Sequence, residues 1–295
     1  MDQFTLLEGD CRQMLKTLPE QSVQCCVTSP PYWGLRDYGH GEQIGLEGTP
    51  DAYVEHMVTV FREVRRVLRD DGVLWLNLGD TIKDKQLQGI PWRVAFALQA
   101  DGWWLRQDII WSKPNPMPES VTDRCTKAHE YIFLLSKSER YYYDAEAVKE
   151  PCVEGPPAGN IGAMNRGRIG AEGWSHDSDK SKPANGRNRR SVWTIATKPY
   201  SGAHFAVMPE DLVQPCILAG CPDGGTVLDP FSGAGTVGVV ANKLNRQYIG
   251  IELNPDYLAL AEARLANVNP LLAYDKPELL PGVPSVQLSL LETTA

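Results

Sequence analysis

The residues best suited to chemistry form one short run of hydroxyl, proline and aromatic side chains: Thr28, Ser29, Pro30, Pro31, Tyr32 and Trp33. Residues 23–27 before it are apolar with β-branched ends, which predicts a buried strand. Each proline lacks an N–H group and holds the preceding residue extended. The strand end should therefore be a stiff ledge carrying a serine hydroxyl, backbone carbonyls without a local partner and an aromatic face. Such a ledge suits a flat ring with an amino group, although an ordinary proline turn would also explain the run.

A second stretch suggests a nucleoside cofactor. Gly233 to Gly238 match G-x-G-x-x-G and lie between a predicted strand, Thr226–Asp229, and a predicted helix. Glu252 follows another predicted strand, residues 248–251, and can accept hydrogen bonds from both hydroxyls of a ribose. A tight strand–helix turn would explain the glycines alone, but not the two carboxylates at strand ends. Nicotinamide cofactors and S-adenosylmethionine both satisfy the pattern.

The other elements follow from apolar periodicity and from capping residues. Further strands are predicted at Phe4–Glu8, 73–78 and 104–111, and helices near 11–18, at 51–69, 91–101 and 209–220, and from Pro255 onward. Two strand-like runs, 131–135 and 141–143, are joined by a short connection, which predicts an antiparallel hairpin at the edge of an otherwise parallel sheet. The chain is therefore predicted to be an α/β protein.

Composition limits the class of protein. The chain has 295 residues, 42% of them apolar, and a net charge of −8, so the molecule as a whole is not a basic nucleic-acid binder. The seven cysteines contain no Cys-x-x-Cys pair, and we expect no metal site. No apolar run approaches membrane length, and the first residues lack the pattern of a signal peptide, so we expect a cytoplasmic protein with no membrane partner.

Residues 151–200 have a different composition. They contain eight Lys and Arg against four Asp and Glu, interleaved with Trp174 and Trp193. A basic segment with aromatic residues on an acidic body predicts a local nucleic-acid contact surface. A solvated surface insertion would explain the same composition.

Together the motifs resemble those of DNA amino-methyltransferases that use S-adenosylmethionine. Ser29-Pro30-Pro31-Tyr32 is similar to the family's catalytic motif, and residues 229–235 are similar to its cofactor motif. The catalytic motif comes first and the cofactor motif last, which is the circularly permuted order of the beta class. Gly9-Asp10 resembles the acidic turn that reaches the cofactor adenine, and residues 204–209 resemble the segment that packs against the methionine part.

This resemblance implies a Rossmann-like methyltransferase sheet of seven strands with an antiparallel pair at one edge and an inserted target recognition region. It divides the chain into a catalytic half (1–144), the insertion (145–200), a cofactor-binding half (201–268) and a C-terminal tail (269–295). It also implies double-stranded DNA as substrate, a homodimer and a connection to restriction–modification.

The resemblance also implies roles for individual residues. The catalytic residues expected are Ser29, Pro30, Pro31 and Tyr32. The cofactor-binding residues expected are Asp10, Cys11, Thr28, His204, Phe205, Met208, Asp229, Phe231, Ser232, Gly233, Gly235, Thr236 and Glu252. The DNA-contacting residues expected are Trp33, Lys113, Arg124, Lys127, Arg166, Arg168, Arg187, Arg189 and Arg190.

The expected chemistry concerns an exocyclic amino group, whose lone pair is delocalised into the ring. If Ser29 Oγ and the Pro30 carbonyl accept its two N–H bonds, the nitrogen can pyramidalise and attack a sulfonium methyl group without a covalent enzyme intermediate. The base must leave the duplex to reach the ledge, where Tyr32 would stack on it.

The motif does not select the base by chemistry alone. Ser29 at the first motif position favours cytosine, whereas Tyr32 is typical of the adenine enzymes. The larger purine should also gain more from stacking on Tyr32 and Trp33, so we predict adenine N6, with cytosine N4 as the alternative.

Three other classes of protein fit the two motifs less well. A protein glutamine methyltransferase has the opposite motif order, and a nicotinamide-dependent reductase leaves residues 29–33 unexplained. A non-catalytic DNA-binding module needs neither motif.

Overall fold

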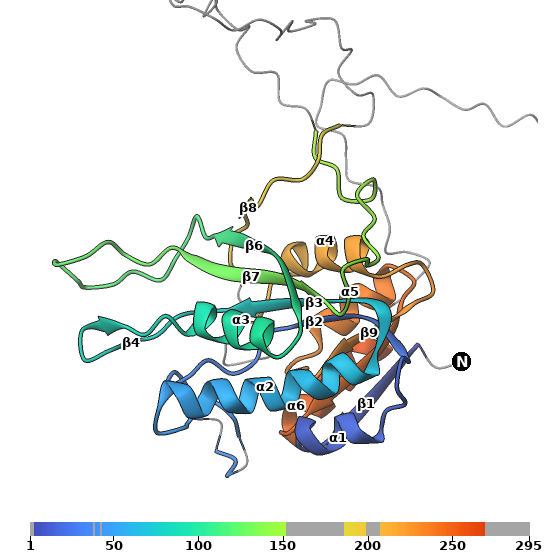
Figure 1. The fold of residues 1–295 in the computed structure, drawn as a ribbon, viewed down its shortest axis with the longest axis horizontal. Coiled ribbons are helices and arrows are strands. Elements are labelled where there is room, and N and C mark those ends of the chain that lie inside the picture. Colours follow the sequence, from blue (N-terminus) through green and yellow to red (C-terminus); the bar gives the residue numbers. More distant parts are fainter. Residues whose placement is uncertain (1–2, 38, 42, 152–185, 199–206, 269–295) are drawn as a thin grey trace, which may run out of the picture.

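The computed structural model describes residues 3–37, 39–41, 43–151, 186–198 and 207–268. Within them one large sheet has eight strands in the order β1-β10-β9-β2-β3-β7-β6-β8 (Figure 1). The strands are β1 (Phe4–Glu8), β2 (Val23–Thr28), β3 (Leu68–Leu78), β6 (Trp104–Ser112), β7 (His129–Ser136), β8 (Val192–Thr194), β9 (Thr226–Asp229) and β10 (Gln247–Glu252). The helices are α1 (Cys11–Thr17), α2 (Pro50–Val67), α3 (Ile90–Ala100), α4 (Glu210–Gly220), α5 (Thr236–Lys243) and α6 (Pro255–Ala266). A small separate hairpin pairs β4 (Ile82–Lys83) with β5 (Gln86–Leu87).

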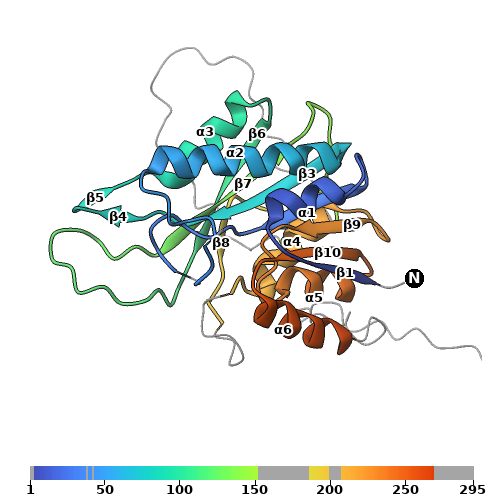
Figure 2. The ribbon, with the colours of Figure 1, turned by 90° about the horizontal axis from the view of Figure 1, so that it is seen from below.

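Helices cover both faces of the sheet. Helices α1, α2 and α3 lie on one face and α4, α5 and α6 on the other, as Figure 2 shows most clearly. Successive strand residues point to opposite faces, so Cys25 packs with one helix layer and Cys26 with the other. Burial on both faces explains why the central strands are continuous apolar runs rather than alternating ones.

Two halves from opposite ends of the chain meet in the middle of the sheet. Strands β2 and β9 pair in parallel, with Cys25 opposite Val227 and Cys26 opposite Leu228. From β9 the chain continues outward to β10, whereas from β2 it continues in the other direction to β3. The strand order therefore reverses between β9 and β2, and such a reversal is where ligands of open α/β sheets bind.

The predicted fold class is confirmed. Strands β1, β10, β9, β2 and β3 are parallel, and β7 is antiparallel to both of its neighbours. These strands and β6 account for the seven expected of a Rossmann-like methyltransferase sheet, and β8 extends the edge by one short strand. Strands β1 and β9 have the predicted bounds.

The predicted hairpin between 131–135 and 141–143 is wrong. Strand β7 pairs instead with β3 and β6, and residues 141–143 form no strand. The three tyrosines mimic a strand because they are apolar and aromatic. In the structure Tyr143 packs against Trp75 with ring centroids 6.4 Å apart, and Tyr142 N donates to Asp71 O. Side-chain packing and one backbone hydrogen bond therefore hold this run against the body of the protein without strand pairing.

Strand β8 lies inside residues 145–200, which we predicted to be an inserted target recognition region. It pairs in parallel with β6, and its central residue, Trp193, is 6% exposed and packs against Trp75. A three-residue strand is too short for periodicity to reveal. Part of the basic segment is thus built into the sheet edge.

Candidate active site

Both sequence motifs lie at one edge of the sheet. The parallel strands β1, β10, β9, β2, β3 and β6 all end there, and the antiparallel strand β7 begins there. The ledge that starts at Ser29 follows β2, and the loop that starts at Pro230 follows β9. Because β2 and β9 are neighbours, the two motifs are adjacent although they are far apart in the sequence.

A buried hydrogen bond joins the two motifs. Thr28 Oγ1 donates to Asp229 Oδ1 over 2.6 Å, and Phe231 N donates to the same oxygen over 3.1 Å. Burial raises the pKa of Asp229 to about 7; the two hydrogen bonds oppose this rise, and the charge of Glu252 adds to it. The Asp229 carboxyl is therefore a mixture of neutral and ionised forms near neutral pH.

Glu252 holds together the turns that follow three strands. Its Oε2 accepts from Gly233 N over 2.7 Å and its Oε1 accepts from Asn254 N over 2.9 Å, while its backbone carbonyl accepts from Gly9 N. Burial raises the pKa of Glu252, and the backbone hydrogen bonds oppose that shift. Each carboxylate oxygen has a second lone pair, so the side chain can still accept from the hydroxyl groups of a ribose.

Asp10 lies beside Glu252 because β1 and β10 pair with Glu8 opposite Glu252. It caps α1 by accepting from Arg12 N over 2.7 Å and also binds the Arg12 guanidinium. Burial opposes ionisation, but the hydrogen bonds and charge of Arg12 outweigh it and lower the pKa of Asp10. Cys11 is 6% exposed and packs in the core, where burial raises the pKa of its thiol to about 12.

Two positions of the predicted cofactor motif, Gly233 and Gly235, require glycine for different structural reasons. Gly233 has a φ of +51°, and a Cβ there would meet nothing within 4 Å, so its outer side is open. Gly235 has a φ of +74°, and a Cβ there would lie 2.9 Å from Ala261 Cβ in α6. The first glycine therefore leaves room over the loop, and the second lets α5 and α6 pack closely.

Four of the remaining predicted cofactor residues make contacts within the described part of the chain. Tyr248 Oη donates to Ser232 Oγ over 2.9 Å, and Arg264 donates to Thr236 Oγ1 over 3.2 Å. Phe231 packs against the core below α1–α3, and Met208 against the core below α4–α6. His204 and Phe205 lie outside the described residues.

These observations fit a nucleoside cofactor. The candidate cofactor site, called the cradle below, combines the carboxylates of Asp10 and Glu252 at adjoining strand ends with the open turn at Gly233. A bound nucleoside would find hydroxyl acceptors and space for close backbone approach. Within the described residues, no group of three or more His, Cys, Asp or Glu side chains is arranged to hold a metal ion.

The predicted catalytic ledge carries a hydrogen-bond network that the sequence did not reveal. Tyr32 Oη donates to Glu130 Oε2 over 2.7 Å, and Ser29 Oγ donates to Tyr32 Oη over 3.3 Å. Asn77 Nδ2 lies within 2.9 Å of Tyr32 Oη, 3.0 Å of Glu130 Oε2 and 3.3 Å of Ser29 Oγ. Lys113 pairs with the other oxygen of Glu130.

The position of the Tyr32 ring depends on a glycine. A Cβ at Gly79 would lie 2.5 Å from Tyr32 Cε2, so any side chain there would displace the ring. Sequence reasoning missed Asn77, Gly79 and Glu130. The only signal available was that Asn77 and Gly79 are polar or small residues at the end of a predicted strand.

The two carbonyls of the ledge differ. Pro31 O accepts from Tyr53 Oη over 2.9 Å, which corrects the expectation that the ledge carbonyls have no partner. Among the described residues, none donates to the Pro30 carbonyl. Ser29 Oγ and Pro30 O thus remain as acceptors for a ligand.

Trp33 is not a surface residue. It is 2% exposed, and its indole Nε1 donates to Glu47 O over 2.8 Å. Its ring packs in the core on the α2 side, so the structure contradicts our expectation that it contacts DNA or stacks on the base. The aromatic residue after the ledge is therefore a packing residue.

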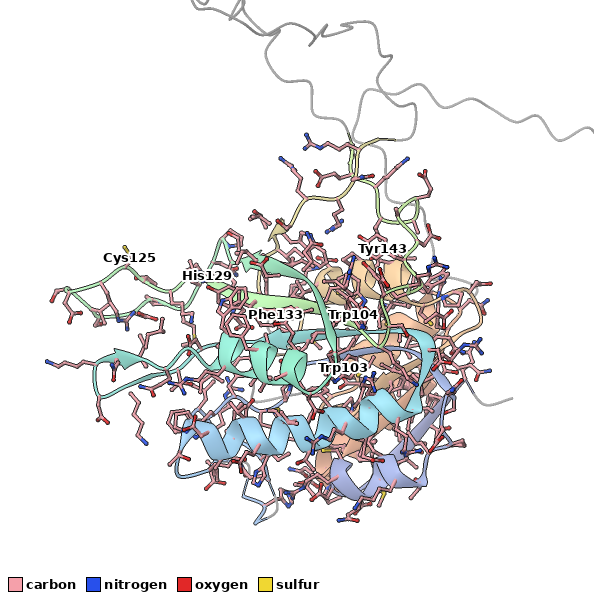
Figure 3. The ribbon with its side chains drawn as sticks, viewed as in Figure 1. Trp103, Trp104, Cys125, His129, Phe133 and Tyr143 are labelled. Atoms are coloured by element: carbon pink, nitrogen blue, oxygen red, sulfur yellow. The ribbon has the colours of Figure 1, made fainter. Side chains whose placement is uncertain are left out.

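The predicted DNA-contacting cations fall into two groups. Lys113, Arg124 and Lys127 lie on the long loop between β6 and β7, with Cys125 on its outer part and His129 where it re-enters the sheet (Figure 3). This loop projects from the same edge as the β4–β5 hairpin in Figures 1 and 2. Arg124 is exposed and pairs with Glu119, whereas burial lowers the pKa of the half-buried Lys127.

The other group lies beside β8 and is engaged in the fold. Arg187 and Arg190 both donate to Glu150 Oε1, over 2.9 and 2.5 Å, and the Arg189 guanidinium lies 4.5 Å from the Trp193 ring centroid. Arg166 and Arg168 lie outside the described residues, as does Trp174.

The fold and the site together are those of an α/β protein whose loops can hold a nucleoside cofactor. Residues 23–263 match the family of N6/N4 DNA methylases. The chain is 48% identical to the Type II methyltransferase M.Cfr9I of Citrobacter freundii over 88% of this chain and 87% of that protein. It is 46% identical to the Type II methyltransferase M.SmaI of Serratia marcescens over 88% of this chain and 90% of that one.

Solved structures agree on the fold. The PvuII DNA methyltransferase (cytosine-N4-specific) is 20% identical and aligns with a TM-score of 0.68, over 92% of this chain and 90% of its own. The M1.HpyAVI–SAM complex is 18% identical with a TM-score of 0.58, over 89% of this chain and 98% of its own.

The chain belongs to the N6/N4 DNA methylase family and is an S-adenosylmethionine-dependent DNA amino-methyltransferase. Its Type II relatives connect it to restriction–modification. No helix among the described residues is long and apolar enough to cross a membrane.

Proposed function

We propose that this enzyme methylates the N4 amino group of a cytosine flipped out of duplex DNA, at the ledge formed by Ser29, Pro30, Pro31 and Tyr32. The observation that carries the proposal is that two acceptors next to the loop after β9 keep unused lone pairs: Ser29 Oγ accepts only from Asn77 Nδ2, and Pro30 O has no donor among the described residues. Two acceptors suffice to hold the two N–H bonds of an amino group.

For the cofactor, S-adenosylmethionine supplies an electrophilic methyl group on a sulfonium sulfur. Glu252 would bind the ribose hydroxyls and Asp10 would face the adenine, because both carboxylates lie at adjoining strand ends. The open turn at Gly233 would allow close backbone approach. The hydrogen bond between Thr28 and Asp229 connects this cradle to the ledge.

The ledge residues then prepare the amino nitrogen. Ser29 Oγ and Pro30 O accept its two N–H bonds, which localises the nitrogen lone pair and directs it away from the ring plane. A bond forms between this nitrogen and the methyl carbon, and the carbon–sulfur bond breaks with its electron pair on sulfur. The nitrogen releases one proton to water. The protein contributes position and electrostatics rather than a covalent intermediate.

The choice of cytosine rests on two residues. Adenine was favoured partly because a purine could stack on both Tyr32 and Trp33, but Trp33 is 2% exposed. Trp33 is therefore not available for stacking, while the association of Ser29 with cytosine in this family remains. Adenine N6 is the second candidate, because Tyr32 is typical of the adenine enzymes.

DNA contacts are proposed for two surfaces. The loop between β6 and β7 carries Arg124 and Lys127 beside the site, and the insertion, residues 145–200, carries Arg190, whose side chain is 66% exposed. Paired cations can exchange their carboxylate partners for phosphate when DNA binds. We further propose that the enzyme is a homodimer that acts in the cytoplasm, with the catalytic half at 1–144 and the cofactor half at 201–268.

Mass spectrometry of nucleosides tests the proposal. DNA would be incubated with purified enzyme and S-adenosylmethionine, digested and compared with DNA treated with Ser29→Ala. N4-methylcytosine that depends on Ser29 is the expected product. N6-methyladenine without N4-methylcytosine would replace the first candidate by the second, and the absence of both would overturn amino-methylation at this ledge.

A further inference from the structure

A partly buried ion pair outside the two motifs lies directly beside the ledge. Glu130, at the start of β7, is 15% exposed in its side chain, and its partner Lys113, just after β6, is 18% exposed. One carboxylate oxygen pairs with Lys113, and the other accepts from Tyr32 Oη and Asn77 Nδ2. Burying such a pair costs desolvation energy that a packed apolar pair would avoid. Its position suggests a role in the site.

The pair determines which way the neighbouring hydroxyl protons point. A carboxylate held by Lys113 is only an acceptor, so Tyr32 Oη gives its single proton to Glu130. Burial first, and then the charge of Glu130, raise the pKa of Tyr32, so the hydroxyl keeps that proton. Tyr32 Oη can therefore only accept from its other neighbours.

The consequence reaches Ser29. Its hydroxyl donates to Tyr32 Oη over 3.3 Å, and Asn77 Nδ2 donates to Tyr32 Oη over 2.9 Å. The serine proton is thus turned away from the open side of the ledge, which leaves a lone pair for an incoming N–H group.

The Asn77 amide supports this polarity. Asn77 is 3% exposed, and its Oδ1 is buried without a hydrogen-bond partner among the described residues. Turning the amide over would place that oxygen against Glu130 Oε2, where two acceptors repel each other. Glu130 therefore holds the amide in an orientation that leaves one of its atoms unsatisfied, at a cost that is typical of a functional constraint.

We propose that Glu130 is a positioning residue that acts through Tyr32 to fix the Ser29 hydroxyl as a hydrogen-bond acceptor towards the amino group of the target base. Asn77 assists with its two N–H groups, whose nearest acceptors are Tyr32 Oη and Glu130 Oε2. The inference deepens the proposed function and rests on it.

The substitution Glu130→Gln reverses the polarity of this chain of hydrogen bonds. Lys113 requires an oxygen, so the glutamine amide must turn its NH2 group towards Tyr32. Tyr32 Oη then accepts from the glutamine and donates to Ser29, whose own proton turns to the base. A donor facing the amino group cannot localise its lone pair.

The expected result is a loss of the single-turnover methylation rate of about 100-fold, the size seen when one oriented hydrogen bond of a transition state is removed. The Kd for S-adenosylmethionine and the KM for DNA should stay within about threefold of the wild-type values, because the residues proposed to bind the cofactor and the DNA are unchanged. A purely structural role would instead lower the unfolding temperature and weaken both affinities.

A matched control is Asp101→Asn. Asp101 is 14% exposed and also paired, with Arg62 over 2.5 Å, but it lies after α3 and takes no part in the site. It should keep the wild-type rate within about threefold, the scatter expected of a remote surface change. Glu130→Asp retains the charge and should be at least about tenfold faster than Glu130→Gln, because a hydrogen bond to a charged group contributes more than one between neutral groups.

A double-mutant cycle tests whether Glu130 acts through Tyr32. If it does, Glu130→Gln combined with Tyr32→Phe should be no slower than Tyr32→Phe alone by more than about threefold, because the shared path is already broken. If the rate losses of the two single variants multiply in the double variant, the inference is overturned. A methylation rate of Glu130→Gln within about threefold of wild type would also overturn it. If Glu130→Gln does not fold, Glu130→Asp as slow as Tyr32→Phe would overturn it instead. A wild-type enzyme that leaves DNA unmethylated would contradict the proposed function itself, so the two failures are distinguishable.

Discussion

Asp229→Asn is expected to change how the stability of the protein depends on pH. The Asp229 carboxyl is 1% exposed at the junction between the two halves, and burial raises its pKa from 3.8 to about 7. Between these values the unfolded chain ionises at Asp229 while the folded protein keeps the proton. Stability from this group is therefore complete below pH 3.8 and is lost as the pH rises through about 7.

The magnitude follows from the size of the shift. One pKa unit corresponds to about 1.4 kcal/mol, so the full loss for Asp229 is about 4 kcal/mol, and about 2.5 kcal/mol of it falls between pH 5 and pH 8. Asparagine is neutral in both states and keeps an oxygen for Thr28 and Phe231. The free energy of unfolding of Asp229→Asn, relative to wild type, should thus rise by about 2.5 kcal/mol between pH 5 and pH 8.

Urea unfolding of both proteins at the two pH values measures this difference directly, because other titrating groups are common to both. Thr28→Val is a useful companion, since it removes the hydroxyl that donates to Asp229 and should make the loss at high pH larger. A difference between wild type and Asp229→Asn that is the same at both pH values would refute the burial of this carboxyl at the junction.

Other predictions concern ligands and assembly. Glu252→Ala should weaken S-adenosylmethionine binding by about 1.5–3 kcal/mol in calorimetry, because the ribose hydroxyls lose a charged acceptor; unchanged affinity would remove Glu252 from the cofactor site. Replacing Arg124 and Lys127 by Gln should weaken DNA binding and reduce its salt dependence by nearly one slope unit for each phosphate that the protein no longer neutralises. Arg190→Gln tests the insertion in the same way, and an unchanged salt dependence of DNA binding would indicate that the segment is a solvated surface insertion. Light scattering should give the mass of a dimer, and a monomer mass at all concentrations would contradict the homodimer.

Local signals predicted much of the fold. Strands β1 and β9 and the start of α6 at Pro255 were predicted correctly, because apolar runs, an Asn254 cap and a proline at the first helical position depend on neighbouring residues only. The hairpin prediction failed because strand pairing depends on distant residues. Nothing near residues 131–135 shows that β3 and β6, rather than 141–143, are its partners.

The site was predicted as two motifs but not as a network. Glu130 contacts Tyr32 across 98 positions in the sequence, and Asn77 contacts Ser29 across 48, so no short window contains either pair. Trp33 shows the same limit in reverse, since an aromatic residue after a proline ledge can equally face a ligand or the core. The sequence shows the positive charge of the arginines beside β8, but it does not show that Arg187 and Arg190 pair with Glu150, which is distant in sequence and close only in the folded chain.

The most direct test of the central claim compares wild type with Ser29→Ala in single turnover, with saturating S-adenosylmethionine and duplex DNA. We predict that the methylation rate falls by about 100-fold or more, because the amino group loses an oriented acceptor. Calorimetric affinity for S-adenosylmethionine should be unchanged, since Ser29 is outside the cofactor cradle. A Ser29→Ala enzyme that transfers methyl groups at the wild-type rate would contradict the claim that this ledge activates the target base.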